Sequence, residues 1–284
     1  MSRRRDIEAT VRSFREIRDI LNAMKNMALM EVHRLGRFLA TQQRVVAAIE
    51  AAGSDFSSFY PELFPRNESW RDVYVLLGSE RGFCGDFNEL LLRALAEHKR
   101  RENVEVVVVG SKLYSKLPRD FRVAAFLEGA SVVDEIENVL VRLMNTVSDT
   151  SGLAAPLRAL RVTAFHHRSQ GEGARVAILQ PFQEPKKGQK SFAYPPRLYL
   201  DPAAFAKGLV EQYLFARLHE LLYSSLMVEN QVRVQHMDAA VQRLDRKSTE
   251  LLRRRNMLRQ EEITEEIEVI MLSAGSPPRI PASN

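Results

Sequence analysis

The chain has 284 residues, 45% hydrophobic and 27% charged, which predicts a folded protein of one or two domains. Its net charge of +5 is too small to argue by itself for a nucleic-acid or membrane-surface partner. The single cysteine, Cys84, excludes an internal disulfide and a cysteine-based zinc site. No apolar run approaches the roughly 18 residues of a membrane span, and acidic residues follow the first arginines where a signal peptide would be apolar. We therefore expect neither a signal peptide nor a membrane-spanning segment.

Residues 1–55 are expected to form one long helix. Residues 1–60 contain no proline, and Gly36 is the only glycine among the first 52 residues, so the usual helix breakers are almost absent. Apolar residues recur there at spacings of three, four or seven: Ile7, Val11, Phe14, Leu21, Met24, Ala28, Leu35, Phe38, Val45 and Ile49. This stripe predicts an amphipathic helix that packs against a partner.

Residues 70–200 read as a small α/β domain. Short β-rich runs lie at residues 72–77, 104–109, 121–126, 160–165 and 175–180. Helical stretches at 86–101, 111–117 and 132–149 separate or follow the first three runs. Alternation of strand and helix predicts a mostly parallel, Rossmann-like sheet, and the four valines at 106–109 suit a strand that is buried on both faces.

Residues 201–275 are expected to form a second, longer helix, because residues 203–276 contain no proline. Its apolar stripe comprises Leu214, Leu218, Leu221, Val228 and Val232, then, after a slip of about one residue, Met237, Val241, Leu244, Leu251, Leu258, Ile263, Ile267 and Ile270. The slip suggests a loosely wound pair rather than a strict long heptad coil. Neither long helix can bury its stripe alone, so we expect an antiparallel coiled coil of the two. Bundles of shorter helices are the alternative, disfavoured because turn residues are missing. Residues 276–284 form a proline-rich tail.

The segment 78–85, Gly-Ser-Glu-Arg-Gly-Phe-Cys-Gly, follows the first expected strand and opens a helix. A phosphate-binding turn would lie there, but the glycine spacing fits neither the dinucleotide-binding nor the P-loop pattern. We expect a tight structural turn that needs Gly82 and Gly85 for its backbone. Cys84 is interpreted as a small packed group rather than a nucleophile, since no histidine is near it in sequence.

The remaining polar residues give no catalytic constellation. His166 and His167 lack a spaced third ligand, so a structural pair at a strand end is the better interpretation, and we expect no metal or cofactor. Residues 243–259 carry seven basic and two acidic residues, a net charge of +5, and residues 260–268 carry five acids and no base, a net charge of −5. These blocks are either a solvated helix face or a docking surface for a partner with complementary charge. The acidic block would repel nucleic acid.

Several motifs in this order resemble the γ subunit of F-type ATP synthases. Residues 78–88 are similar to that family's (S/T)-D-R-G-L-C-G-G-L-N signature, and residues 23–25 match its A-M-K. Asp201-Pro202 corresponds to an acidic-Pro step before the last helix. The following positions match at the family's spacing: Glu229, Arg233, Met237, Ala239, Ala240, Asn256, Arg259, Gln260, Ile263, Thr264 and Glu266. The resemblance covers almost the whole chain.

The chain also departs from the family pattern. Arg255 replaces a tyrosine of the closing block, Val269 its second glutamate and Ser273 its glycine, and the basic run after Met27 is altered. The tail extends beyond the usual helix end. These departures suggest a divergent γ subunit from an alternative F-type ATPase, which translocates either sodium ions or protons. The sequence lacks the cysteine-pair insertion of redox-regulated chloroplast γ subunits and a transit peptide, which favours a bacterial protein.

The resemblance implies a central-stalk rotor without a catalytic site. Its partners would be the α and β subunits of an α3β3 hexamer, the ε subunit and the c-ring, at the cytoplasmic face of the bacterial inner membrane. It would associate with the membrane only peripherally, through the complex, and would not bind nucleic acid. By position, the contacts with α and β subunits would be Met24, Lys25, Arg81, Arg254, Arg259, Gln260, Thr264 and Glu266.

Two other classes of protein remain as alternatives. A nucleotide-binding α/β protein with helical dimerisation arms would bind ATP or NAD at the Gly82 turn. A coiled-coil scaffold would self-associate or bind DNA in a salt-dependent manner. The order of the motifs argues against both.

Overall fold

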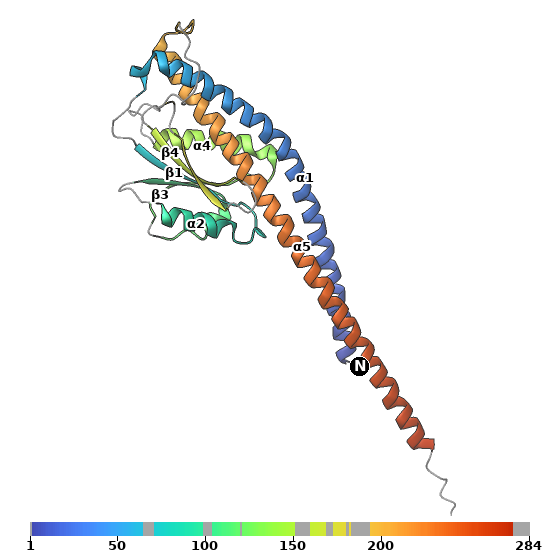
Figure 1. The fold of residues 1–284 in the computed structure, drawn as a ribbon. Helices are drawn as coiled ribbons and strands as arrows, with labels where there is room; N and C mark the ends of the chain where they lie inside the picture. The colour runs from blue at the N-terminus through green and yellow to red at the C-terminus, as the bar shows by residue number, and fades with distance from the viewer. Residues whose placement is uncertain are drawn as a thin grey trace, which may run out of the picture. The chain divides into compact units, whose positions relative to one another are not determined.

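The computed structural model describes residues 2–64, 71–98, 104–119, 121–150, 160–168, 173–179, 182 and 194–274. The chain divides into two compact units. Unit 1 comprises Met1–Lys25 and Met237–Asn284, and unit 2 comprises Asn26–His236. Two long helices, α1 (Ser2–Phe59) and α5 (Pro202–Ala274), each contribute residues to both units (Figure 1). The prediction of two long terminal helices is confirmed, whereas the tail at 276–284 lies outside the described residues.

The start of α5 is capped by its own sequence. The Asp201 carboxylate accepts hydrogen bonds from the backbone N–H groups of Ala203 and Ala204, at 3.0 and 3.3 Å. Pro202 occupies the first helical position, where a missing N–H has no cost. The acidic-Pro step is therefore a helix-start signal, and it fixes where the chain leaves the α/β domain.

In unit 1, α1 and α5 pair antiparallel. Ion pairs between their described residues include Lys25 to Asp238 at 2.9 Å, Arg18 to Asp245 at 3.7 Å, and Arg4 to Glu262 at 3.2 Å. Partner numbers rise on α5 as they fall on α1, which requires opposite chain directions. The buried cluster of this unit is small and comprises Leu21, Met237 and Val241, and Val11 is buried as well.

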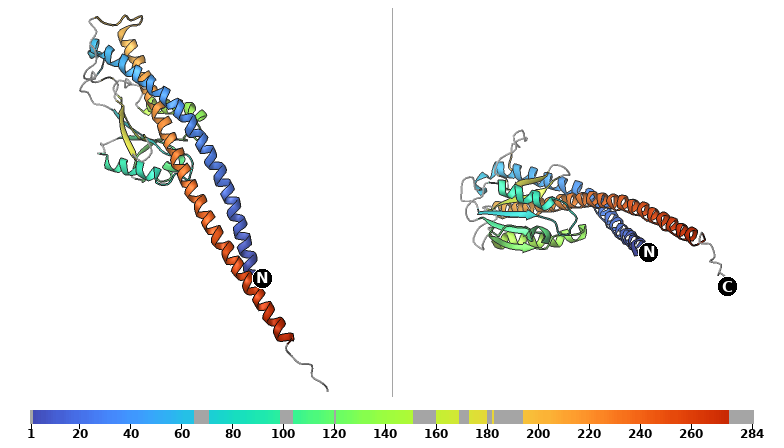
Figure 2. Two further views of the ribbon diagram at one scale, coloured as in Figure 1. Left: turned by 45° about the vertical axis from the view of Figure 1, so that its right-hand side comes forward. Right: turned by 90° about the horizontal axis from the view of Figure 1, so that it is seen from below.

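Unit 2 is built on a β-sheet (Figure 2). Its five described strands follow the order β3-β2-β1-β4-β5. The strands are β1 (Arg71–Leu77), β2 (Glu105–Val109), β3 (Val123–Leu127), β4 (Leu160–His167) and β5 (Ala174–Leu179). All pairs are parallel except β4 with β5, which confirms the mostly parallel sheet. The shorter helices are η1 (Pro61–Leu63), α2 (Phe87–Glu97), α3 (Ser111–Tyr114), η2 (Val133–Glu135) and α4 (Ile136–Thr150).

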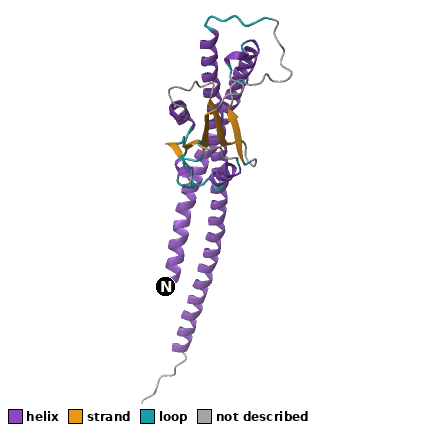
Figure 3. Cartoon of the chain, turned by 90° about the vertical axis from the view of Figure 1, so that its left-hand side faces the viewer, coloured by secondary structure: helices purple, strands orange, loops and turns teal. Residues whose placement is uncertain are grey.

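Both faces of the sheet are covered (Figure 3). Val107 and Val109 join a core with α4 and with the unit 2 parts of the two long helices. Val106 and Val108 point to the other face and pack with Leu91 of α2. Residues 106–109 are at most 2% exposed, as expected for a strand that is buried on both sides.

Some boundaries and faces differ from the sequence prediction. In α1 the stripe is displaced by one residue: Leu39 and Val46 are buried, whereas Phe38 and Val45 are 46% and 43% exposed. Drift of a 3.6-residue period against a fixed spacing accounts for the displacement. The helix expected at 111–117 ends at Tyr114, because Lys116 and Leu117 form tighter turns before Pro118. Within the described residues, no helix is both long and apolar enough to cross a membrane.

Candidate functional site: a pinned turn and the exposed end of α5

The turn between β1 and α2 needs glycine at some positions and not at others. Gly85 has a φ of +55°, and a Cβ there would lie 2.0 Å from Nε2 of His236 on α5. Gly82 has no such requirement, since a Cβ would meet nothing within 4 Å. The expectation of a glycine-dependent turn therefore holds at Gly85 and is wrong at Gly82. Phe83 at the tip has a φ of 63° and is 58% exposed, a strained conformation for a residue with a side chain.

A buried ion pair on α5 anchors this turn to the helix. Glu229 and Arg233 are 2% and 5% exposed and form an ion pair one helical turn apart. Arg233 Nε also donates to the Gly82 carbonyl at 3.3 Å, and its terminal nitrogen donates to Asn230 Oδ1 at 2.7 Å. The guanidinium thus ties the turn to α5 and satisfies its own donors, which a buried charge requires.

Cys84 belongs to this cluster, and its thiol is not activated as a nucleophile. Its thiol donates to the Arg81 and Gly82 carbonyls, both at 3.3 Å, and lies 3.8 Å from Glu229 Oε1. Burial, assisted by the Glu229 charge, raises the pKa of the Cys84 thiol to about 12. Burial also raises the pKa of Glu229 to about 7, although the Arg233 charge opposes the shift. The thiolate needed for nucleophilic chemistry is therefore not formed near neutral pH, in agreement with the packed-group interpretation.

Glu80 lies at the carboxyl end of the sheet, where doubly wound folds usually bind a ligand. Its carboxylate accepts hydrogen bonds from the Ser111 N–H at 3.0 Å, the Ser111 hydroxyl at 2.6 Å and the Gly129 N–H at 2.7 Å. Burial alone would raise the pKa of Glu80, but these hydrogen bonds outweigh burial and the net shift is downward. Gly110, with a φ of +106°, has backbone 2.7 Å from where its Cβ would be. The carboxyl ends of β1, β2 and β3 are thus closed by the chain itself.

His166 and His167 lie at the end of β4 and are structural. They are 4% and 2% exposed, and the His167 ring stacks on Phe87 at 3.9 Å while Nε2 donates to the Phe87 carbonyl at 2.9 Å. Burial lowers the pKa of His166 to about 4 and also lowers that of His167. Among the described residues, no group of three or more metal-ligating side chains comes together.

Met24 and Lys25 are engaged within unit 1. Met24 packs against the Leu21, Met237 and Val241 core, and Lys25 Nζ donates to Asp238 Oδ1 at 2.9 Å. The hydrogen bond from Lys25 lowers the pKa of Asp238. Any partner that uses Lys25 must therefore compete with a carboxylate of this chain.

The other expected contact residues on α5 share an exposed stretch of one helix. Arg254, Arg259, Gln260, Thr264 and Glu266 are all exposed, and the Thr264 hydroxyl donates to the Gln260 carbonyl at 2.9 Å. The described part of the chain gives no ion pair to Arg254, Arg259 or Glu266. Arg81 is also exposed but belongs to unit 2.

The end of α5 is apolar as well as charged. Ile263, Ile267 and Ile270 are 45%, 52% and 63% exposed, and Met271 and Leu272 are 70% and 77% exposed. Exposed apolar side chains at this density mark a surface that another protein covers. The segment 254–272, which we call the α5 end, is therefore the candidate interaction site.

Comparisons with known proteins agree with this arrangement. A model of the ATP synthase family matches residues 3–276. The chain belongs to the ATP synthase gamma-chain family. It is therefore a subunit of an enzyme complex, the ATP synthase.

The relatives of this gamma chain cover nearly all of its length. A gamma chain of Clostridium perfringens strain 13 is 25% identical over 277 residues, 94% of this chain and 95% of its own. A gamma chain of Acidothermus cellulolyticus is 27% identical over 286 residues, 90% of this chain and 93% of its own.

Solved structures share the fold. The rotor of the Euglena gracilis mitochondrial ATP synthase matches with a TM-score of 0.59 and 15% identity, covering 92% of this chain and 98% of that one. The central stalk of the Tetrahymena thermophila enzyme matches with a TM-score of 0.55 and 18% identity, covering 78% and 99%.

Sequence reasoning placed Glu229 and Arg233 on the family pattern but assigned them no role. A signal was available, because two opposite charges four residues apart each directly follow a residue of the apolar stripe, Val228 or Val232. Charges at such positions are expected to pair when the face is buried. The role of Glu80 had no local signal, since its partners Ser111 and Gly129 lie 31 and 49 residues away.

Proposed function

We propose that this gamma chain couples ion flow through the membrane c-ring to synthesis or hydrolysis of ATP at the β subunits. It has no catalytic site of its own in this proposal. The paired helices contact the α and β subunits of an α3β3 hexamer, and the α/β domain contacts the ε subunit and the c-ring. The complex lies at the cytoplasmic face of the bacterial inner membrane, to which the chain is bound only peripherally.

One observation carries this proposal most strongly. The α5 end continues a 73-residue helix and leaves apolar and charged side chains uncovered by the described chain. A rotor needs a stiff rod whose contacts with its partners differ from one rotational position to the next, because equal contacts shift no equilibrium. An exposed helix with a basic block at 243–259 and an acidic block at 260–268 offers such an uneven surface.

Within this surface, Arg259, Gln260 and Thr264 form polar contacts with loops of the β subunit, together with Arg254 and Glu266. Their exposure and the absence of ion-pair partners for Arg254, Arg259 and Glu266 in the described chain support this assignment. Arg81, in unit 2, is a separate contact with the α or β subunits. Met24 and Lys25 face the acidic lever of the β subunit. Because Lys25 already pairs with Asp238, a β-subunit carboxylate that binds Lys25 replaces the Asp238 carboxylate.

The test is the double variant Arg259→Ala with Gln260→Ala in the reassembled complex. We expect loss of coupled ATPase activity, with an unchanged circular dichroism spectrum of the free subunit. The matched control is Gln43→Ala with Arg44→Ala, the same two residue types exposed on α1 and outside both charge blocks. Full activity of the first variant, or equal loss in both, would contradict the assigned contact.

A further inference from the structure

The seam between the helices of unit 1 contains three polar residues. Its least exposed positions alternate at spacings of three and four: Val11, Phe14, Arg18, Leu21 and Lys25 on α1, and Met237, Val241, Leu244, Ser248 and Leu251 on α5. Such positions are normally filled by large apolar side chains in paired helices. Arg18, Lys25 and Ser248 depart from that rule, and Arg18 and Ser248 do so at neighbouring levels of the seam.

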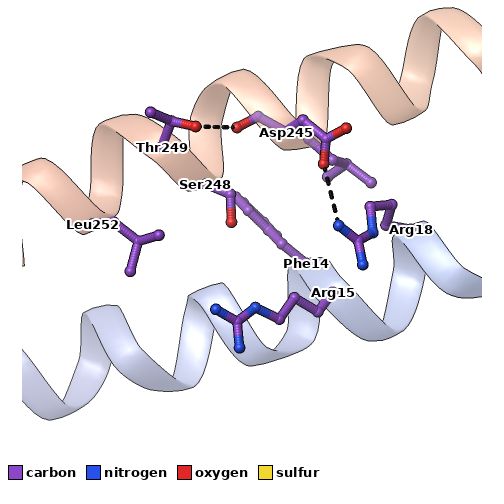
Figure 4. Close-up of a pocket in the computed structure, with 8 residues that line it drawn as sticks. Phe14, Arg15, Arg18, Asp245, Ser248, Thr249 and Leu252 are labelled. Carbon is purple, nitrogen blue, oxygen red and sulfur yellow. Dashed lines mark hydrogen bonds and ion pairs between the residues drawn. The ribbon is translucent and has the colours of Figure 1, made fainter.

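This departure leaves a cavity of about 340 Å³ between the two helices (Figure 4). A serine side chain occupies much less volume than the leucine expected at such a position, so the helices do not close there. Phe14, Leu244 and Leu252 supply apolar lining. The volume is at the lower end of the range for small-molecule sites, which begins at roughly 300 Å³.

Some polar groups of the cavity are already committed. Arg18 is shared between Asp19 at 3.1 Å and Asp245 at 3.7 Å. The Thr249 hydroxyl donates to the Asp245 backbone carbonyl at 2.9 Å. Figure 4 shows the Arg18–Asp245 pair at one end of the groove and Leu252 at the other.

Two donors at the groove remain available. Within the described part of the chain, neither the Arg15 guanidinium nor the Ser248 hydroxyl has a hydrogen-bond or ion-pair partner. The two arginines and one aspartate that line the groove give it a net charge of +1. An available cation and hydroxyl beside an apolar lining are complementary to a ligand with a ring and a negative group.

We propose that this groove binds a small aromatic anion, a carboxylate or sulfonate on one or two fused rings. The ring packs on Phe14, Leu244 and Leu252, and the anion accepts hydrogen bonds from Arg15 and Ser248. A cation is disfavoured by the net charge of the groove. An acidic side chain of a partner protein would engage Arg15 but would leave the apolar lining uncovered.

The probe is 2-naphthoate, titrated into the full-length chain and followed by ligand-observed NMR. The control ligand is 2-naphthamide, which has the same ring and nearly the same shape but no charge. We expect 2-naphthoate to bind with a Kd on the order of 1 mM, the value that ordinary ligand efficiency gives for a molecule of this size. The amide is expected to bind about tenfold more weakly, because it loses the charge-assisted hydrogen bond.

Three variants test the residues. Arg15→Gln should weaken 2-naphthoate about tenfold and leave 2-naphthamide unchanged. Arg12→Gln, an exposed arginine of the same helix outside the groove, should change neither affinity. Ser248→Leu fills the gap in the seam, so it should abolish binding of both ligands without lowering the melting temperature of the chain.

Specific outcomes would overturn the proposal. Equal affinity for 2-naphthoate and 2-naphthamide would show that the groove does not recognise an anion. Equal weakening by Arg12→Gln and Arg15→Gln would indicate diffuse attraction to a basic helix. Binding that survives Ser248→Leu would place the ligand elsewhere, and absence of binding to the unaltered chain would show that the groove takes no such ligand.

Discussion

Units 1 and 2 use the same two helices in different ways. In unit 2, α1 and α5 pack against a covered sheet, and residues such as Leu35 and Leu218 are completely buried. In unit 1 the described parts of the same helices pack on each other through a small cluster of Leu21, Met237 and Val241 and through ion pairs such as Lys25–Asp238. Most helix stability in proteins comes from burial of an apolar face, so unit 2 is expected to be far more stable locally than unit 1.

This difference shows how one helix can serve two purposes. Where α5 passes the sheet, its charges Glu229 and Arg233 are buried and fixed to a turn. Beyond Glu262, which pairs with Arg4 of α1, the apolar side chains of Ile263, Ile267 and Met271 are exposed. The predictions below test the part of α5 that is buried beside the sheet separately from the part that is exposed.

The largest effect is expected from breaking the buried pair in unit 2. Arg233→Ala leaves the Glu229 carboxyl buried without its cation, which typically costs about 3–5 kcal/mol of unfolding free energy. The double variant Glu229→Leu with Arg233→Met removes both charges and should recover most of the loss. Urea unfolding followed by circular dichroism measures both, and Arg246→Ala on the exposed face of α5 in unit 1 is the control. A loss in Arg233→Ala no larger than in the control would refute the pinning role.

The turn itself gives a matched pair of glycines. Gly85→Ala forces a side chain into a φ of +55° and against His236, so we expect a loss of about 1–3 kcal/mol. Gly82→Ala has open space and should stay within about 0.5 kcal/mol of the unaltered chain. Adding His236→Ala to Gly85→Ala should relieve the contact but not the backbone strain. Equal effects at positions 82 and 85 in thermal melts would show that the turn is not held as described.

A more gradual effect is expected from pH. Burial lowers the pKa of His166 from 6.5 to about 4, and also lowers that of His167 and His219. The unfolded chain therefore takes up protons first, so stability present above about pH 6.5 is lost as the pH falls towards 4. The raised pKa of Glu229 acts in the opposite direction between 4.5 and about 7.

Melting temperatures across this range, measured in a Glu229→Gln background, isolate the histidine contribution. His166→Asn should flatten the acid slope, because asparagine does not titrate. An unchanged slope would mean that His166 is not the group that senses acid.

The smallest effect is expected from the ion pairs of unit 1. Lys25→Met keeps the apolar stem against the seam and removes the partner of Asp238. Partly exposed pairs contribute little to stability, so the fold should persist and only amide exchange near residue 25 should become slightly faster. Hydrogen exchange with mass spectrometry measures this. A collapse of unit 1 in this variant would mean that ion pairs, rather than the apolar seam, hold it together.

Much of this fold was readable from the sequence because the signals are local. The segregation of proline predicted both long helices, and the valine run at 106–109 predicted a doubly buried strand. The displacement from Phe38 to Leu39 was missed because a fixed spacing ignores the drift of the helical period; Phe38, although half-exposed, still stacks on the Tyr223 ring at 5.9 Å.

The candidate site was predicted less completely. Exposure of Arg259 and Gln260 followed from a charged helix end, but the requirement for glycine at 85 rather than 82 depends on where His236 passes the turn. The Glu80 contacts and the groove beside Ser248 likewise arise from segments that are distant in sequence. Such features depend on packing between segments that are distant in sequence, which the periodicity of apolar residues does not predict.

The most direct test of the account uses the single cysteine of the chain. Cys84 is buried and its pKa is raised to about 12, so a maleimide photocrosslinker should react only with an introduced thiol in the variant Gln260→Cys. The labelled chain is assembled into its ATP synthase complex, irradiated, and its adducts are identified by mass spectrometry. The account predicts adducts with the β subunit. Adducts confined to the ε subunit or the c-ring, or no adducts in an active complex, would contradict the assignment of the α5 end as the surface that meets the catalytic subunits.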